Sequence, residues 1–162
     1  MRVPRDARLS DIDGDGDQDL LVLFVGEIYG GGGTSHSETV EGKGVAVYWN
    51  VDNAFLADNY SLVDLTSLAY VIDVAVLRAS ASNNGLVMLG PDGIWHAALD
   101  VATHTFAAPT IIWNVFGASR LEVADFDDDG LDDIAYLIGD SMQLLLQVSA
   151  RELTKSGDEV QK

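Results

Sequence analysis

The chain has 162 residues, of which 48% are apolar, so it is long enough for one folded domain and too apolar for an intrinsically disordered protein. Its formal net charge of −17 argues against nucleic acids and anionic membranes as partners. The chain contains no cysteine, which excludes disulfides and thiolate metal sites without fixing a cellular compartment.

Two features bear on targeting and membrane insertion. The first residues, MRVPRDARLSD, lack an apolar h-region, so we expect no signal peptide in this chain. No apolar run approaches the roughly 18 residues that a membrane helix requires, so we expect no membrane insertion.

Short apolar or alternating runs, separated by turn residues, predict an all-β protein. The turns include Asn84-Gly85, which is typical of a tight hairpin, and Pro91-Asp92-Gly93. Residues 26–44 are rich in glycine and predict an insertion between two strands, whereas the polar tail 151–162 is expected to be a short helix or disordered. The predicted strands are 19–24, 44–49, 70–77, 85–90, 94–99, 110–113, 119–124, 133–138 and 142–148.

Internal repetition divides the chain into similar units. The segment DIAYLIGDSMQLLLQ aligns with GLVMLGPDGIWHAAL, which begins 48 residues earlier, and two aspartate-rich stretches lie 114 residues apart. We therefore predict a single repeat domain, 1–150, built from three units of about four strands. The units are 1–66, 67–114 and 115–150, and the last is expected to lack its fourth strand.

Eleven of the 20 aspartates lie in two stretches that share the pattern D-x-D-x-D-G-x-x-D. So many carboxylates repel one another unless a cation neutralises them. Alternate carboxylates can converge on one point if the glycine at the sixth position lets the backbone turn, and the seventh residue can add its carbonyl. Calcium suits such flexible oxygen coordination better than magnesium does, so we expect two Ca²⁺ sites. The predicted ligands are Asp11, Asp13, Asp15, Asp17 and Asp19 in the first loop, and Asp125, Asp127, Asp129, Leu131 and Asp133 in the second.

The same loop opening occurs in EF-hands, which also need a bidentate glutamate at the twelfth position and flanking helices. Here the twelfth positions are Val22 and Tyr136, and each loop runs into a predicted strand. A calcium loop within a β-hairpin therefore fits better than an EF-hand.

This combination resembles the FG-GAP/VCBS repeats of integrin-like β-propellers, best in FGASRLEVADFDDDGLDDIAYLIGD, residues 116–140. The resemblance implies four-stranded antiparallel blades, with a structural calcium in the loop between each blade's first two strands. The middle unit departs from the pattern, because Arg78, Ser80 and Ser82 stand where carboxylates are expected. The Arg78 guanidinium either replaces the missing ion or is a solvent-facing turn arginine.

These features favour a non-catalytic module that binds a protein or glycan ligand, or serves as a scaffold, in an extracellular or cell-surface setting. The alternative is a fragment of a propeller enzyme similar to polysaccharide lyases or phospholipases. No nucleophile–base arrangement is evident among the three histidines, so we expect no catalytic residues. Because closed propellers have four to eight blades, three blades are expected to close by self-association, against a partner, or with the remainder of a longer propeller.

Overall fold

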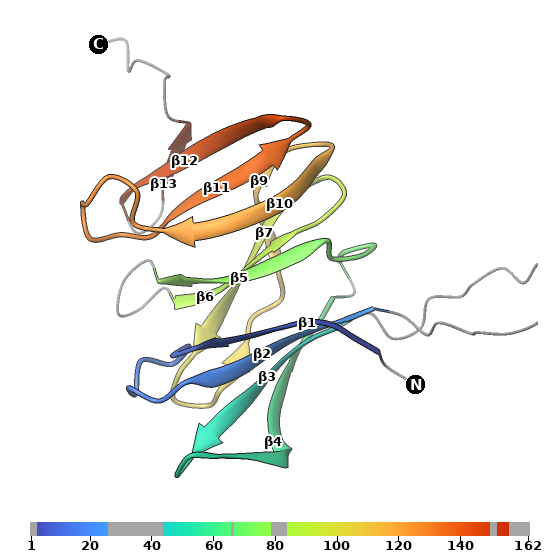
Figure 1. Ribbon diagram of the computed structural model, residues 1–162, viewed down its shortest axis with the longest axis vertical. Helices are drawn as coiled ribbons and strands as arrows, with labels where there is room; N and C mark the ends of the chain where they lie inside the picture. Colours follow the sequence, from blue (N-terminus) through green and yellow to red (C-terminus); the bar gives the residue numbers. More distant parts are fainter. Residues whose placement is uncertain (1–2, 26–43, 66, 79–83, 150–151, 156–162) are drawn as a thin grey trace, which may run out of the picture.

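The computed structural model describes residues 3–25, 44–65, 67–78, 84–149 and 152–155. These residues form three antiparallel β-sheets and no helix, which confirms the all-β prediction. Figure 1 shows the sheets stacked in chain order along the long axis of the molecule. In the described ranges there is accordingly no helix that could span a membrane.

Each sheet is built from consecutive strands, so most neighbours in a sheet are also neighbours in the chain. The first sheet contains β1 (Val3–Ser10), β2 (Asp19–Val25), β3 (Gly44–Val51) and β4 (Ala54–Val63). The middle sheet contains β5 (Asp73–Arg78), β6 (Asn84–Leu89), β7 (Gly93–Asp100) and β8 (Thr105–Phe106), with β9 (Thr110–Asn114) paired to β7. The third sheet contains β10 (Ala118–Ala124), β11 (Asp133–Ile138), β12 (Ser141–Ser149) and β13 (Glu152–Lys155).

The expectation that the third unit lacks a fourth strand is wrong. Residues Glu152–Lys155, within the predicted polar tail, form β13 and pair with β12. The segment is an edge strand, where charged residues are tolerated because they discourage pairing with other chains. Its composition therefore gave no apolar signal. Residues 156–162 and the glycine-rich insertion, apart from Gly44, lie outside the described residues.

The core consists of two hydrophobic clusters, one on each face of the middle sheet. Within β6, Leu86 and Met88 belong to the cluster shared with the first sheet, while Val87 and Leu89 belong to the one shared with the third. Side chains alternate between the faces of a strand, so burial on both sides explains the unbroken apolar run of β6.

One carboxylate connects all three sheets. Asp73, at the start of β5, is 3% exposed. Its Oδ1 accepts a hydrogen bond from Arg8 Nη2 of β1 at 2.9 Å, and its Oδ2 accepts one from Leu121 N of β10 at 3.2 Å. Asp73 therefore joins the first and third sheets to the middle one.

A half-buried histidine with a buried Nε2 atom lies within the middle sheet. His96 Nε2, in β7, has no hydrogen-bond partner among the described residues, and burial lowers the pKa of His96. The site is crowded, because a Cβ at Gly85 would collide with the Ala97 carbonyl and approach the imidazole. His96 is thus held neutral within the sheet.

Mild acidification is expected to destabilise the protein through His96. An unfolded histidine takes up a proton near pH 6.5, whereas the half-buried imidazole stays neutral to lower pH. The unfolded state then binds more protons, so the free energy of unfolding falls as the pH falls below about 6.5. Between about pH 7.5 and 5.5, wild type should therefore lose more stability than His96→Gln in urea unfolding. Equal losses in the two proteins would contradict this account.

Candidate metal centres

Each acidic loop joins the first two strands of its sheet. Residues 11–18 connect β1 to β2, and residues 125–132 connect β10 to β11. Strands on both sides of each loop agree with a hairpin setting and leave no room for the flanking helices of an EF-hand.

The two loops share left-handed backbone conformations at two equivalent positions. The fourth position is left-handed in both, with φ of 83° at Gly14 and 60° at Asp128. The sixth position is also left-handed, with φ of 98° at Gly16 and 88° at Gly130. Left-handed residues at both positions let the chain curl, and aspartate is among the few non-glycine residues that tolerate this conformation.

The curl brings three carboxylates together in each loop. One oxygen from each of Asp11, Asp13 and Asp15 lies within 4.8 Å of the others. Oxygens that bind one calcium at about 2.3–2.6 Å are at most about 5 Å apart, so this group fits a shared ion. The second loop meets the same limit with Asp125, Asp127 and Asp133.

The remaining predicted ligands are placed differently. The carboxylates of Asp17 and Asp19 are not part of the first group, and the Asp129 carboxylate is not part of the second. Asp129 Oδ1 instead accepts a hydrogen bond from the Leu131 amide at 2.8 Å. The predicted carbonyl ligands, Asp17 and Leu131, lie in the loops at their expected seventh positions.

Amides within each loop already bond to the clustered carboxylates. In the first loop, Asp11 Oδ1 accepts from Gly14 N at 2.8 Å, and Asp13 Oδ1 accepts from Asp15 N at 3.1 Å. In the second, the two oxygens of Asp125 accept from the amides of Asp129 and Gly130. These bonds preform the curl and still leave each oxygen a lone pair for a cation.

The ninth position of the pattern is buried, with Asp19 2% and Asp133 0% exposed. Asp19 accepts hydrogen bonds from the amides of Ile12 and Asn50, both at 3.0 Å.

Asp133 accepts equivalent bonds from the amides of Phe126 at 2.9 Å and Gln147 at 2.7 Å. Each ninth-position carboxylate therefore ties its loop to the third strand of its own sheet, a role that the spacing alone did not reveal.

The loops carry excess negative charge. Burial raises the pKa of Asp19, and the nearby carboxylates of Asp13 and Asp15 raise it further, against the two backbone bonds that lower it. Desolvation raises the pKa of Asp127, with the neighbouring carboxylates of Asp129 and Asp133 adding to the effect. Negative charge is thus disfavoured in both loops, and a bound cation would relieve this.

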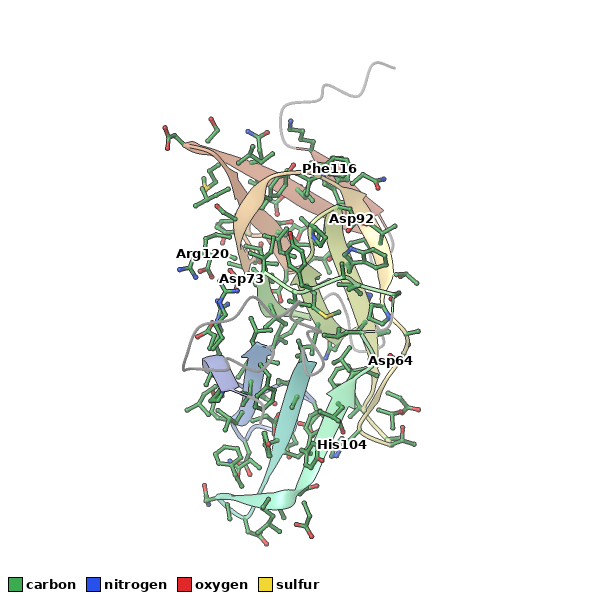
Figure 2. All side chains as sticks on the ribbon, turned by 90° about the vertical axis from the view of Figure 1, so that its right-hand side faces the viewer. Asp64, Asp73, Asp92, His104, Phe116 and Arg120 are labelled. Atoms are coloured by element: carbon green, nitrogen blue, oxygen red, sulfur yellow. The ribbon has the colours of Figure 1, made fainter. Side chains whose placement is uncertain are left out.

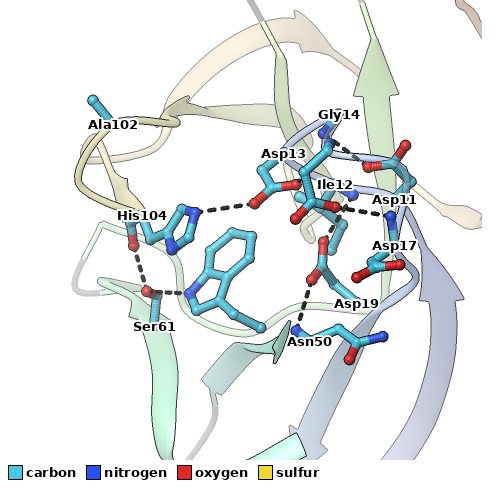
Figure 3. Close-up of polar contacts among 12 residues, drawn as sticks. Asp11, Ile12, Asp13, Gly14, Asp17, Asp19, Asn50, Ser61, Ala102 and His104 are labelled. Carbon is cyan, nitrogen blue, oxygen red and sulfur yellow. Dashed lines mark hydrogen bonds and ion pairs between the residues drawn. The ribbon is translucent and has the colours of Figure 1, made fainter. Parts of the chain in front are cut away.

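A hairpin of the middle sheet reaches the first loop, as Figure 3 shows. His104, between β7 and β8, places Nε2 3.0 Å from Asp13 Oδ2 and stacks on Trp49 of β3 with ring centroids 4.2 Å apart. Trp49 Nε1 donates to Ser61 Oγ at 2.9 Å, and that hydroxyl donates to the His104 carbonyl. Sequence analysis missed this contact, because no local pattern relates His104 to the aspartate loop.

Arg78 bridges the two acidic loops. Its guanidinium donates to the Asp11 carbonyl at 2.9 Å and to Ser10 Oγ at 3.3 Å. Its backbone amide donates to Asp132 Oδ2 at 2.7 Å. The guanidinium thus contacts the first loop of the neighbouring sheet, and Ser80 and Ser82 lie outside the described residues.

No protein-family model matches the chain, and no curated protein shows detectable similarity to it.

Proposed function

We propose that the chain is a calcium-binding β-propeller module of three blades, with one structural ion in each acidic loop. The observation that carries the proposal is the convergence of three carboxylate oxygens in both loops to within 4.8 Å. The shared left-handed conformations and the like position of the loops in their sheets support it. The ion would neutralise each loop and stabilise the hairpin that it closes.

Calcium is expected to raise the melting temperature of the protein above that in chelator. Extracellular calcium modules have dissociation constants of about 10⁻⁴–10⁻³ M, so about 10 mM calcium adds roughly 1.4–2.7 kcal/mol per site. Magnesium should have a smaller effect, because it demands closer to ideal octahedral geometry. Differential scanning calorimetry in calcium, magnesium and chelator measures these differences.

Two variants make this experiment specific. Asp127→Ala should remove the response of the second loop, whereas Asp140→Ala removes an exposed carboxylate in the turn between β11 and β12 and should leave the response intact. A melting temperature that chelator does not change would refute the calcium proposal.

The outer faces of the end sheets support closure by further blades. On the first sheet, the face opposite the core carries a row formed by Leu9, Leu20, Tyr48 and Tyr60 in register. Leu9 is 60% exposed. On the third sheet, Leu137 pairs with Met142, which is 67% exposed. Exposed apolar faces of this kind are unfavourable in water and often mark interaction sites.

We propose that these faces pack against blades from a second copy or from the remainder of a longer propeller. Two copies related by a twofold axis would give six blades, within the four to eight of closed propellers. The mass in solution, measured by light scattering, distinguishes these two sources of additional blades. A dimer supports the second copy, and a monomer with both faces open supports the longer chain.

A non-catalytic role, in protein or glycan binding or as a scaffold, agrees with the histidines that the structure describes. His96 is half-buried, with its Nε2 unpartnered among the described residues, and His104 contacts Asp13 and Trp49. Neither is placed to move a proton on a bound substrate, which weighs against an enzyme fragment. Millimolar calcium is available outside cells, so we propose an extracellular or cell-surface setting.

A further inference from the structure

A polar cavity of about 180 Å³ lies where the first strands of the three sheets approach one another. Its lining residues are Arg5, Asp6, Leu23, Ile72, Asp73 and Arg120. Four of these six are charged: Asp73 is buried at the base of the cavity, Asp6 is half-buried, and Arg5 and Arg120 are exposed at its mouth. Figure 2 shows Asp73 and Arg120 on the same side of the molecule.

Three of the charges occupy equivalent places in the three sheets. Asp6 is paired with Leu23, Asp73 with Leu89, and Arg120 with Leu137, in each case between the first and second strands of the sheet.

Bulges adjoin two of these positions, one between Pro4 and Asp6 and one between Ala118 and Arg120. The first bulge contains Arg5 as its extra residue. Bulges redirect side chains, so the two arginines reach the cavity through local irregularities of otherwise regular strands.

The carboxylates at the cavity are already satisfied. Asp6 accepts hydrogen bonds from the Ala7 amide at 3.0 Å and Arg8 Nε at 3.1 Å. Asp73 accepts from the Val74 and Leu121 amides and from Arg8 Nη2. Arg8 is therefore paired with both carboxylates.

The guanidinium groups of Arg5 and Arg120, by contrast, have no ion pair or hydrogen bond to any residue in the described ranges. With Arg8 included, three guanidinium groups face two carboxylates, which leaves one positive charge in excess. Three of the five lysines and arginines in the described part of the chain gather here, although the whole chain carries a net charge of −17.

We propose that this cavity binds a small oxyanion, the phosphate or carboxylate group of a compact molecule, between Arg5 and Arg120. Guanidinium groups match both oxyanions, since their planar N–H donors bond two oxygens at once. The volume is below the roughly 300–1,000 Å³ of sites for larger ligands, so the anion is small. This site contains none of the proposed calcium ligands and does not depend on them.

Isothermal titration calorimetry of the full chain in calcium-free buffer at constant ionic strength tests the proposal. Inorganic phosphate and malonate are titrated separately, with chloride as the reference anion. We expect saturable binding of at least one oxyanion, and the preferred one identifies the phosphate or the carboxylate class. Arg120→Gln and Arg5→Gln should each weaken binding about tenfold or more, because each removes a charge-assisted hydrogen-bond donor.

Lys155→Gln is the matched control, because it removes one positive charge from β13, outside the cavity, and should bind like wild type. Wild-type protein that shows no saturable binding at about 10 mM phosphate and malonate would overturn the proposal whatever the variants do. Arginine variants that bind as tightly as Lys155→Gln would also overturn it. If calcium does not stabilise the protein, the calcium proposal fails, but the anion-binding result is unaffected because the titration is done without calcium.

Discussion

Replacing Asp133 with alanine is expected to lower the free energy of unfolding by about 3–5 kcal/mol. The carboxylate is 0% exposed and accepts bonds from the amides of Phe126 and Gln147. Alanine would leave both amides without an acceptor, and each buried, unpaired amide costs about 1–3 kcal/mol. Urea unfolding of wild type and variant measures the loss.

The same measurement in chelator separates two roles of Asp133. If the carboxylate stabilises the sheet through its amide bonds, most of the loss remains when calcium is removed. Asp133→Asn, which keeps one acceptor oxygen, should lose roughly half as much as alanine. A variant as stable as wild type in chelator would show that Asp133 acts only through the metal.

Replacing Asp73 with alanine is expected to cost about 2–5 kcal/mol, because two backbone amides lose their acceptor and one link between the sheets is removed. This carboxylate is 3% exposed and holds Arg8 from β1 and the Leu121 amide from β10. Its removal leaves the Leu121 and Val74 amides without this acceptor, and it leaves Arg8 with Asp6 as its one carboxylate partner. Urea unfolding followed by circular dichroism would record the loss.

A double-mutant cycle isolates the ion pair within this effect. Arg8→Met alone should cost less than Asp73→Ala, because the carboxylate keeps its amide donors. The coupling between the two substitutions should be about 0.5–3 kcal/mol. Additive effects would show that Arg8 and Asp73 do not interact in solution, and Asp73→Ala within about 0.5 kcal/mol of wild type would contradict the role of the carboxylate.

The acidic loops were predictable because their chemistry is local. All of the clustered carboxylates fall within nine residues, and glycine at the sixth position marks the turn in both loops. The pattern could not show that the ninth carboxylate is buried against the third strand. That fact depends on Asn50 and Gln147, which only the folded sheet brings beside the loops.

Strands were predictable where both faces are buried or where burial alternates, as in β6 and β7. β1 and β4 were missed, since β1 is rich in charge and β4 is exposed over most of its length. Contacts between sheets could not be predicted from the sequence either. Arg8 and Asp73 lie 65 residues apart, and nothing in the local sequence of either predicts the pair.

Arg78 gives the molecule a mechanical link that neither acidic loop has alone. Its guanidinium is bonded to the first loop through the Asp11 carbonyl, and its amide is bonded to the second through Asp132. Both loops therefore bond to the same residue, and we expect a conformational change in one loop to affect the other. Under the calcium proposal, we therefore expect the occupancy of one loop to change the cation affinity of the other.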